Sequence, residues 1–512
     1  MFRRCIQLLL VLSLFSFMAV GAPNLCLADA GAKAGDKAET AKSSGTRMEH
    51  DFLGDKAVPA SAYYGVQAER AIENFPFNSH TMEHYPNFII AFAYVKKAAA
   101  LANNQIGDLS DEKTKAIVAA CDEVIAGKLH DQFPIDMIQG GAGTSTNMTV
   151  NEVLANRGLE IMGKAKGQYE FLHPNDDLNY GQSTNDTYPT SIKLAVILGL
   201  EDAFKSIKKL EDALAAKGEE FKNVIKMGRT EMQDAVPVTL GQEFSGFAYT
   251  IREATTQLKQ ARDAFYIINM GGTAIGTGIT SSPKYAPLVT KILAKETGYP
   301  FVLAPSLVGA SSDAGGFVQM SGALKRMGLQ ISKVCNDLRL MSSGPRAGLY
   351  EIRLPPMQPG SSIMPGKVNP VIPEVVSSVA YQLAGFDTTV SMAAELSSLE
   401  LNPVEAIIAY SLLQGVSYLT TACDLLADKC VKGIQANKER LEEMVKKSIG
   451  IVTALKPVLG YEKSAAIAKE ALKTNGSVYD LVLQKGWLSK EQLDDLLKPE
   501  KMTQPRELPS SK

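Results

Sequence analysis

Histidine, tryptophan and clustered cysteine are scarce in this chain, and each scarcity excludes a class of site. No CxxC pair and no His/Cys cluster with zinc-site spacing occurs. GxxxxGK[ST] is absent, and the glycine run GGTAIGTG does not have the GxGxxG spacing, so no nucleotide-binding loop is expected. A Ser-His-Asp hydrolase is disfavoured because the hydroxyl-rich loops contain none of the 5 histidines, His50, His80, His84, His130 and His173.

An excess of charge of one sign is also lacking. The chain carries 53 Lys and Arg against 55 Asp and Glu, a formal net charge of −2. This balance argues against a nucleic-acid binder held by phosphate contacts. The 512 residues are enough for more than one domain and a large core.

The first residues are different in character from the rest. A basic start, MFRR, precedes the apolar run CIQLLLVLSLFSFMAVGA and the small-residue end Ala28-Asp29-Ala30. This order predicts a secretory signal peptide over residues 1–30, export to the periplasm and no stable membrane association after cleavage. The alternative is an uncleaved membrane anchor, because the apolar run reaches spanning length. Residues 31–47 are small and polar and predict a disordered leader.

Four cysteines remain in the predicted mature chain, all in apolar helical contexts. Two of them are seven residues apart, so on one helix their Cα atoms would be about 10 Å apart, too far for a disulfide. We therefore expect buried free thiols at Cys121, Cys335, Cys423 and Cys430.

Three long segments carry a helical period, and strand signals are sparse. Apolar residues recur every three or four positions in 192–214, in 317–341 and from 371 to about 399. The third pattern breaks there and resumes after Asn402-Pro403. Helices this long and apolar predict a mainly α protein whose bundle continues across subunits. The predicted domains are 48–182, a central bundle at 183–438 and a small helical domain at 439–512.

Five loops rich in Gly, Ser, Thr, Asn and Pro punctuate the helical pattern: 139–149, 181–190, 227–237, 269–278 and 360–370. Ser, Thr or Asn before a helix is what N-capping requires. Several such residues in one loop exceed that need, and helix N-termini also bind carboxylates. We expect the loops to serve both purposes, with 360–370 as a shaped anion-binding loop.

Together these loops resemble the signature sequences of the aspartase/fumarase superfamily. GSSIMPGKVNPVIPE matches most specifically, and the superfamily order also holds for GGAGTSTNMTVNEVLANRGLEIMG, GQSTNDTYPT, GRTEMQDAVPVTLGQE and ISKVCNDLRLMSSGPRAGL. The resemblance spans residue 48 to the C-terminus. AYYGVQAERAIENF and QDAVP are similar to the ammonia-lyase branch more than to the hydratase branch.

The resemblance implies a three-domain, mainly α fold and a homotetramer with a core of about 20 helices, each site being built from three subunits. It implies β-elimination of ammonia from L-aspartate to give fumarate and ammonium, with no required cofactor and no metal site. Some members are stimulated by Mg²⁺, but no motif here marks a site for it. Two alternatives stay open: hydration of fumarate to malate, and a catalytically silent homologue that binds C4-dicarboxylates.

The resemblance also assigns residues. Ser361 would be the base, acting as an alkoxide on a loop that Gly360, Pro365 and Gly366 allow to close. The substrate-binding residues would be Thr144, Ser183, Thr184, Asn185, Thr230, Lys367 and Asn369. Lys367 and Asn369 would bind one carboxylate of the substrate. Thr144, Ser183 and Thr184 would bind the other carboxylate, which takes up the extra charge, and Asn185 would bind the amino group. Accessory candidates are Glu231, Glu374, Ser362 and Arg70.

Glu231 departs from the superfamily pattern, in which histidine or glutamine follows GRT. The acidic partner of that histidine maps to Glu374, so two carboxylates would face each other and one pKa would rise. Our hypothesis is that Glu231 helps bind the substrate ammonium. The alternative is a substitution tolerated near the mouth of the site.

If Glu231 binds the ammonium, Glu231→Gln raises the KM for L-aspartate by about tenfold, because a charge-assisted hydrogen bond becomes a neutral one. Steady-state kinetics at several aspartate concentrations measure the effect. Unchanged kinetics would leave Glu231 without this role.

Overall fold

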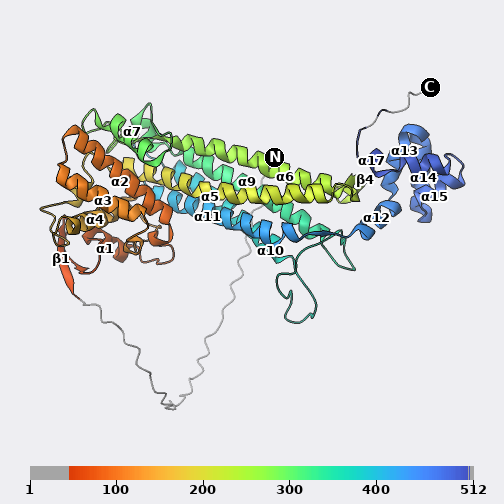
Figure 1. Cartoon of the computed structure of the whole chain (residues 1–512), viewed down its shortest axis with the longest axis horizontal. Helices are drawn as coiled ribbons and strands as arrows, with labels where there is room; N and C mark the ends of the chain where they lie inside the picture. The colour runs from red at the N-terminus through yellow and green to blue at the C-terminus, as the bar shows by residue number, and fades with distance from the viewer. Residues whose placement is uncertain (1–44, 506, 508–512) are drawn as a thin grey trace, which may run out of the picture. The chain divides into compact units, whose positions relative to one another are not determined.

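Long helices dominate the computed structural model, which describes residues 45–505 and 507. The predicted signal peptide and residues 31–44 of the predicted leader lie outside the described residues. Within the unit Gly45–Lys512, five long helices run side by side (Figure 1). They are α5 (Thr184–Glu220), α6 (Leu240–Asp263), α9 (Gly315–Met341), α10 (Val371–Glu395) and α11 (Glu405–Lys429). The mainly α prediction is confirmed, since the three periodic segments are α5, α9 and the pair α10 and α11.

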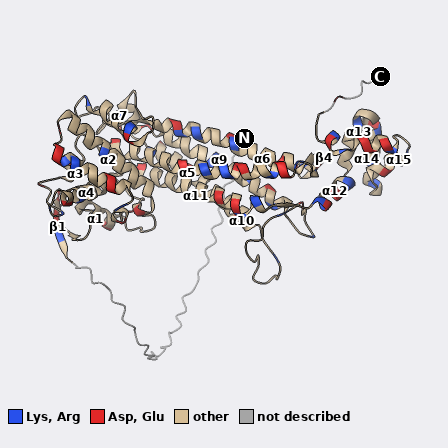
Figure 2. Ribbon diagram, viewed as in Figure 1, with Lys and Arg blue, Asp and Glu red and all other residues tan. Residues whose placement is uncertain are grey.

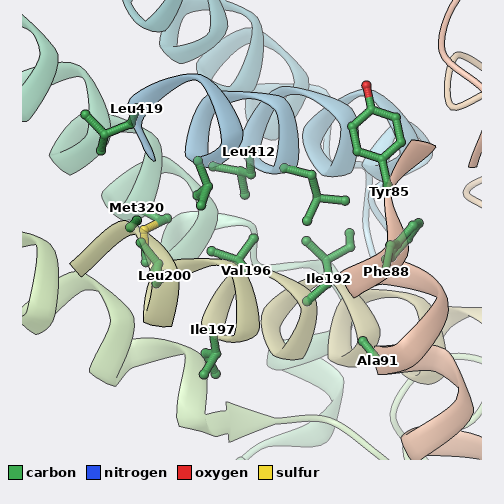
Figure 3. Packing of buried hydrophobic residues seen from close by; sticks show 14 of the residues in the cluster. Tyr85, Phe88, Ala91, Ile192, Val196, Ile197, Leu200, Met320, Leu412 and Leu419 are labelled. Atoms are coloured by element: carbon green, nitrogen blue, oxygen red, sulfur yellow. The ribbon is translucent and has the colours of Figure 1, made fainter. Parts of the chain in front are cut away.

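The bundle core is made by the apolar stripes of these helices. In Figure 3, Ile192, Val196 and Leu200 of α5 face Leu412 and Leu419 of α11. α5 also packs on α6, and α9 packs on both α6 and α10. Among the described residues one segment, Glu405–Gly433, is long and apolar enough to cross a membrane. This segment contains α11, which is apolar because it packs between α5 and α10 inside the bundle.

The N-terminal elements gather at one end of the bundle (Figure 1). They are β1 (Thr46–Asp51), β2 (Gly54–Pro59), α1 (Val66–Asn74), α2 (Pro86–Ile106), α3 (Asp111–Ile125) and α4 (Thr144–Ile161). β1 pairs with β2 in antiparallel register and begins before residue 48, where the sequence placed the start of the domain. The reason is Arg47, whose guanidinium donates to Glu49 Oε1 at 2.7 Å and to the carbonyls of Ala62 and Tyr64 at 2.7 and 2.6 Å. These bonds order the residues ahead of the predicted boundary.

Strands are short and occur in two-stranded sheets. β3 (Ile225–Thr230) and β4 (Gln233–Thr239) form an antiparallel hairpin. β5 (Ile267–Ile268) pairs in parallel with β6 (Val302–Leu303), and β7 (Ile352–Arg353) pairs antiparallel with β8 (Gln435–Ala436). Two further helices, α7 (Tyr285–Thr297) and α8 (Leu307–Ser312), lie between β5 and α9 in the chain.

The last part of the chain has a hydrophobic cluster of its own. Its helices are α12 (Lys438–Lys447), α13 (Val452–Leu459), α14 (Tyr461–Thr474), α15 (Val478–Gln484), α16 (Lys490–Leu496) and α17 (Pro499–Met502). Leu455, Ile467 and Leu493 are fully buried in this cluster, and Met227 of β3 packs into it. The hairpin β3–β4 is therefore held by the C-terminal helices. The domain boundaries at 183 and 439 stay predictions.

Charged residues of both signs are mixed along the described helices (Figure 2). The four cysteines of the predicted mature chain are free and buried, as the sequence predicted. Burial raises the pKa of the Cys430 thiol to about 12, so this thiol stays protonated at neutral pH.

Helices α5 and α6 approach closely at two glycines, Gly218 and Gly241. A methyl carbon added at Gly241 would lie 2.5 Å from Lys222 Cα, 2.6 Å from Lys222 N and closer still to the carbonyl oxygen of Gly218. These are backbone atoms that no side-chain rotation can move. On the same helix, a methyl carbon at Gly246 would meet no atom within 4 Å.

We therefore expect opposite effects from one substitution at two sites of α6. Gly241→Ala lowers the free energy of unfolding by about 1–3 kcal/mol, since the helices must separate. Gly246→Ala, the matched control, raises it by about 0.5–1 kcal/mol, because alanine favours the helix and nothing obstructs it. Urea unfolding followed by circular dichroism measures both. Equal effects of the two substitutions would contradict the close crossing.

Candidate active site

Three of the predicted binding residues, Thr144, Ser183 and Thr184, line one open hollow of about 370 Å³. Thr144 is the first residue of α4, and Ser183 caps α5, whose first residue is Thr184. The positive ends of two helix dipoles therefore meet at the hollow, which favours an anion. The other lining residues are Gln67, Asn147, Met148, Asn175, Asn179, Gln182, Thr273, Ala274, Ile279 and Thr280.

Local sequence explains why both helices begin here. Ser183 Oγ accepts from the backbone N–H of Asn185 at 3.2 Å, and Ser183 N donates to Asp186 Oδ1 at 3.0 Å, which together form a capping box. Gly143 precedes α4 with φ of 83°, and a methyl carbon there would lie 2.7 Å from Tyr188 Cγ. Only glycine allows the chain to enter α4 this close to the Tyr188 ring.

Asp186 also shapes the opposite wall. Its Oδ2 accepts from the backbone N–H groups of Gly271 and Thr273, each at 3.0 Å, which brings the loop 269–278 to the hollow. Burial raises the pKa of this carboxyl to about 6, although the three backbone N–H groups lower it. A buried carboxylate thus joins the start of α5 to a loop far along the chain.

Asn185 lies beside the hollow, but its side chain is turned to the loop. Its Nδ2 donates to the carbonyl of Ala274 at 2.6 Å, and Asn185 is not among the lining residues. In this chain, therefore, the amide holds the loop, and a contact with a substrate amino group would require it to leave Ala274.

Thr230 and Glu231 lie at the tip of the β3–β4 hairpin. Both side chains are exposed, and the turn residues Glu231 and Met232 have φ of 52° and 63°. Non-glycine residues adopt this left-handed conformation uncommonly. The hairpin thus presents the Glu231 carboxylate from a tight turn.

The loop 360–370 folds on itself around Ser361. Ser361 Oγ accepts from the backbone N–H groups of Ile363 and Met364 at 3.2 and 3.1 Å. Gly360 N donates to Lys367 O at 2.8 Å, and Asn369 Nδ2 donates to Gly360 O at 2.9 Å. A methyl carbon on Gly360 would lie 2.7 Å from Lys367 O, so glycine is required for this closure. Lys367 is exposed, as is Ser362, while Glu374 follows in the first turn of α10.

The hairpin and this loop are joined by a buried ion network. Glu351, which is 0% exposed and directly precedes β7, lies 2.6 Å from Arg229 Nη1 and 2.8 Å from Lys226 Nζ. Both cations belong to β3. The hairpin tip and the segment that leads into the loop therefore share one anchor.

The predicted residues thus fall into three groups in one chain: the hollow, the hairpin and the loop. No residue of 360–370 or 230–231 lines the hollow. The chain between α9 and α10 leaves the bundle well away from α1 and α4 (Figure 1). The long helices keep the hollow apart from the hairpin and the loop, so a single chain does not assemble the predicted site.

Arg70 binds residues of the hairpin β1–β2. Its Nε and Nη2 donate to the two oxygens of Asp51 at 2.8 Å each, and Nη2 also donates to Gly54 O at 2.9 Å. The hydrogen bonds of Arg70 hold the pKa of the Asp51 carboxyl below its usual value. Arg70 does not line the hollow.

Sequence reasoning missed most of the amides of the hollow. Asn147, Asn179 and Gln182 line it, and the ammonium of the buried Lys96 donates to the last two at 3.0 Å each. One signal was available: Asn147 and Asn151, four residues apart, share a face of α4.

No three His, Cys, Asp or Glu side chains of residues 45–505 and 507 gather so as to hold a metal ion.

Known proteins show similarity over nearly the whole described chain. The family model described as "Lyase" matches residues 54–385, and that of the "Fumarase C C-terminus" matches residues 451–504. An aspartate ammonia-lyase of Helicobacter pylori is 56% identical over 460 residues, which are 90% of this chain and 98% of that protein.

Two solved structures are similar as well. One is the cobalt-bound "fumarate lyase:delta crystallin" of Brucella melitensis, with 50% identity, a TM-score of 0.88 and coverage of 90% of this chain and 100% of the other. The second is a class II fumarase of Schistosoma mansoni, with 36% identity, a TM-score of 0.85 and coverage of 90% and 99%.

Proposed function

Because this chain belongs to the lyase family that includes the aspartate ammonia-lyases, we propose that it removes ammonia from L-aspartate reversibly to give fumarate. The chain is a carbon–nitrogen lyase. Its substrates are small molecules: L-aspartate in one direction, fumarate and ammonium in the other.

The surroundings of Ser361 carry the proposal. A serine is a poor base unless its anion is stabilised. Two backbone N–H groups, of Ile363 and Met364, already donate to Ser361 Oγ. Such donors stabilise an alkoxide more than a neutral hydroxyl. Ser361 can then remove the Cβ proton of aspartate, beside the carboxylate on which charge builds up.

The hollow suits that carboxylate. Proton removal leaves a second negative charge on the group, so catalysis needs donors placed where this charge develops. The hydroxyls of Thr144, Ser183 and Thr184 and the N-termini of α4 and α5 meet this need. Lys367 and Asn369 would bind the other carboxylate when the loop closes, and Thr230 would complete the pocket.

A homotetramer with three-chain sites would bring the three groups together. The surface of α10 supports this part of the proposal. Between Glu374 and Glu395 the one charged residue of α10, Asp387, is buried. Tyr381 and Met392 are 60% and 71% exposed, and a methyl carbon at Gly385 would meet no atom within 4 Å. An uncharged, partly apolar helix face of this length is suited to packing against other copies of the chain.

Export to the periplasm is part of the proposal and rests on the sequence of residues 1–30 alone. Activity without an added cofactor is expected, since the chemistry described needs only hydroxyls, N–H groups and one ammonium. Assay with and without a chelator tests for stimulation by Mg²⁺.

Purified protein is expected to form fumarate from L-aspartate and not from L-malate. Ser361→Ala lowers kcat by at least about a hundredfold, because the base is lost. Near-ultraviolet absorbance of fumarate measures both, and circular dichroism of the variant checks that the fold is kept. Fumarate from malate alone would instead favour the hydratase, which the similarity to the Schistosoma fumarase makes the second candidate.

Mixing two inactive variants tests the shared site. Ser361→Ala damages the loop and Thr184→Val the hollow, so co-expressed chains should regain about a quarter of wild-type activity if the two residues come from different chains. Affinity tags on each variant isolate the mixed tetramers.

The matched control for this mixing combines Ser361→Ala with Lys367→Ala. Both residues belong to one loop of one chain, so no activity should return. Failure of the first pair to recover, with mixed tetramers present, would place Ser361 and Thr184 of one site in the same chain.

A further inference from the structure

Lys96 of α2 is a buried lysine behind the hollow. Its side chain is 1% exposed, and its ammonium donates to Asn179 Oδ1 and Gln182 Oε1 at 3.0 Å each. Both acceptors belong to residues that line the hollow. No carboxylate forms an ion pair with Lys96 among the described residues. A lysine held in this way by neutral amides needs an explanation, since burying a charge is costly.

Lys96 and the carbonyl of Gln182 together orient the Asn179 amide, whose Nδ2 donates to Gln182 O at 3.2 Å. An ammonium only donates, so Asn179 must turn its oxygen towards Lys96. The same oxygen accepts from Asn147 Nδ2 at 3.1 Å and from Asn151 Nδ2 at 3.2 Å. Those two side chains must therefore present their NH₂ groups to Asn179.

The orientation is passed on to Thr184. Asn147 Nδ2 also donates to Thr184 Oγ1 at 3.1 Å, while Asn147 Oδ1 accepts from Thr187 Oγ1 at 3.2 Å. Thr184 Oγ1 is thus an acceptor towards the protein interior. No acceptor within residues 45–505 takes its hydroxyl hydrogen, which is left to point into the hollow.

The ammonium form fixes this arrangement most strictly, because the nitrogen of a neutral amine also carries a lone pair that can accept. Burial lowers the pKa of Lys96 to about 7, while the charge of the nearby Asp186 carboxylate raises it. The neutral amine still has two N–H groups, enough for the two amide oxygens. The Asp186 carboxylate accepts hydrogen bonds from three backbone N–H groups and none from Lys96.

We propose that Lys96 is a positioning residue which, through Asn179 and Asn147, makes Thr184 a hydrogen-bond donor to the substrate carboxylate. The inference rests on the proposed function, because it assigns that carboxylate to the hollow. Without Lys96 the Asn179 oxygen loses one of its three donors, so Asn179 and Asn147 are held less firmly and Thr184 can turn its hydroxyl hydrogen away from the hollow.

The test is a double-mutant cycle on aspartate turnover. Lys96→Met keeps the length of the side chain and removes its donors, and kcat/KM for L-aspartate is expected to fall about tenfold, the loss of one hydrogen bond. Thr184→Val alone lowers it about a hundredfold. In the Thr184→Val background, Lys96→Met should lower kcat/KM by about twofold or less, because the effect of Lys96 is exerted through Thr184.

Lys97→Met is the matched control. Lys97 is the next residue of α2 and pairs with Asp122 and Glu296, each at 2.8 Å, away from the hollow. Its replacement is expected to leave kcat/KM within about twofold of wild type while changing stability. A loss equal to that of Lys96→Met would mean that both act by weakening the fold, and it would overturn the inference.

Asn147→Leu provides a second arm that does not depend on folding of Lys96→Met. This substitution removes the hydrogen bond from Asn147 to Thr184 with little change in side-chain size. Its effect on kcat/KM should likewise be smaller in the Thr184→Val background than in the wild type. Additive losses in both cycles would overturn the role of Lys96 and leave the lyase intact. Wild-type protein that forms no fumarate from aspartate would instead remove the proposed function and this inference with it.

Discussion

The buried carboxylate of Asp186 is the interaction on which the hollow depends. Its two oxygens accept three backbone N–H groups, from Ser183 at the start of α5 and from Gly271 and Thr273 in a loop over eighty residues later. These bonds compensate a charge whose burial raises the pKa of Asp186 to about 6. Replacing the carboxylate would leave N–H groups on both sides of the hollow without an acceptor.

The network behind the hollow works on the same principle. Buried polar groups must all be paired, so each fixed donor forces its neighbour to accept. One series of hydrogen bonds runs from Lys96 through Asn179 and Asn147 to Thr184, which lies at the surface of the hollow. In the proposed mechanism, the orientation of a hydroxyl at the surface of the hollow thus depends in part on a buried residue behind it.

Long helices impose the other constraint. α5, α9, α10 and α11 are straight, well-packed elements, and loops at their two ends cannot meet within one chain. The hairpin is anchored by Glu351, which lies in the segment that leads into the loop 360–370, whereas the hollow is built by the N-termini of α4 and α5. A site that needs all three groups requires more than one copy of the chain, which makes assembly a condition of the proposed chemistry.

Much of this could be predicted from sequence because the signals are local. The 3.6-residue period marks α5, α9, α10 and α11, and apolar surroundings mark the four buried thiols. Ser183, Thr184 and Thr144 stand out as hydroxyls before helices, and Gly and Pro mark the loop of Ser361. The bonds that Arg47 makes to the carbonyls of Ala62 and Tyr64 could not be predicted in this way, because composition does not connect these residues.

By itself, then, the sequence determined the helical class, the family and the chemical groups available, because periodicity and motif order are properties of the linear chain. Only the tertiary structure decided which groups meet. It brought Lys96, Asn147, Asn179 and Thr184 together from four segments and turned the Asn185 amide towards Ala274. It also separated the hollow from the Ser361 loop. The physical reason is that hydrogen-bond direction and the length of rigid helices act in three dimensions, where neighbours in space are rarely neighbours in sequence.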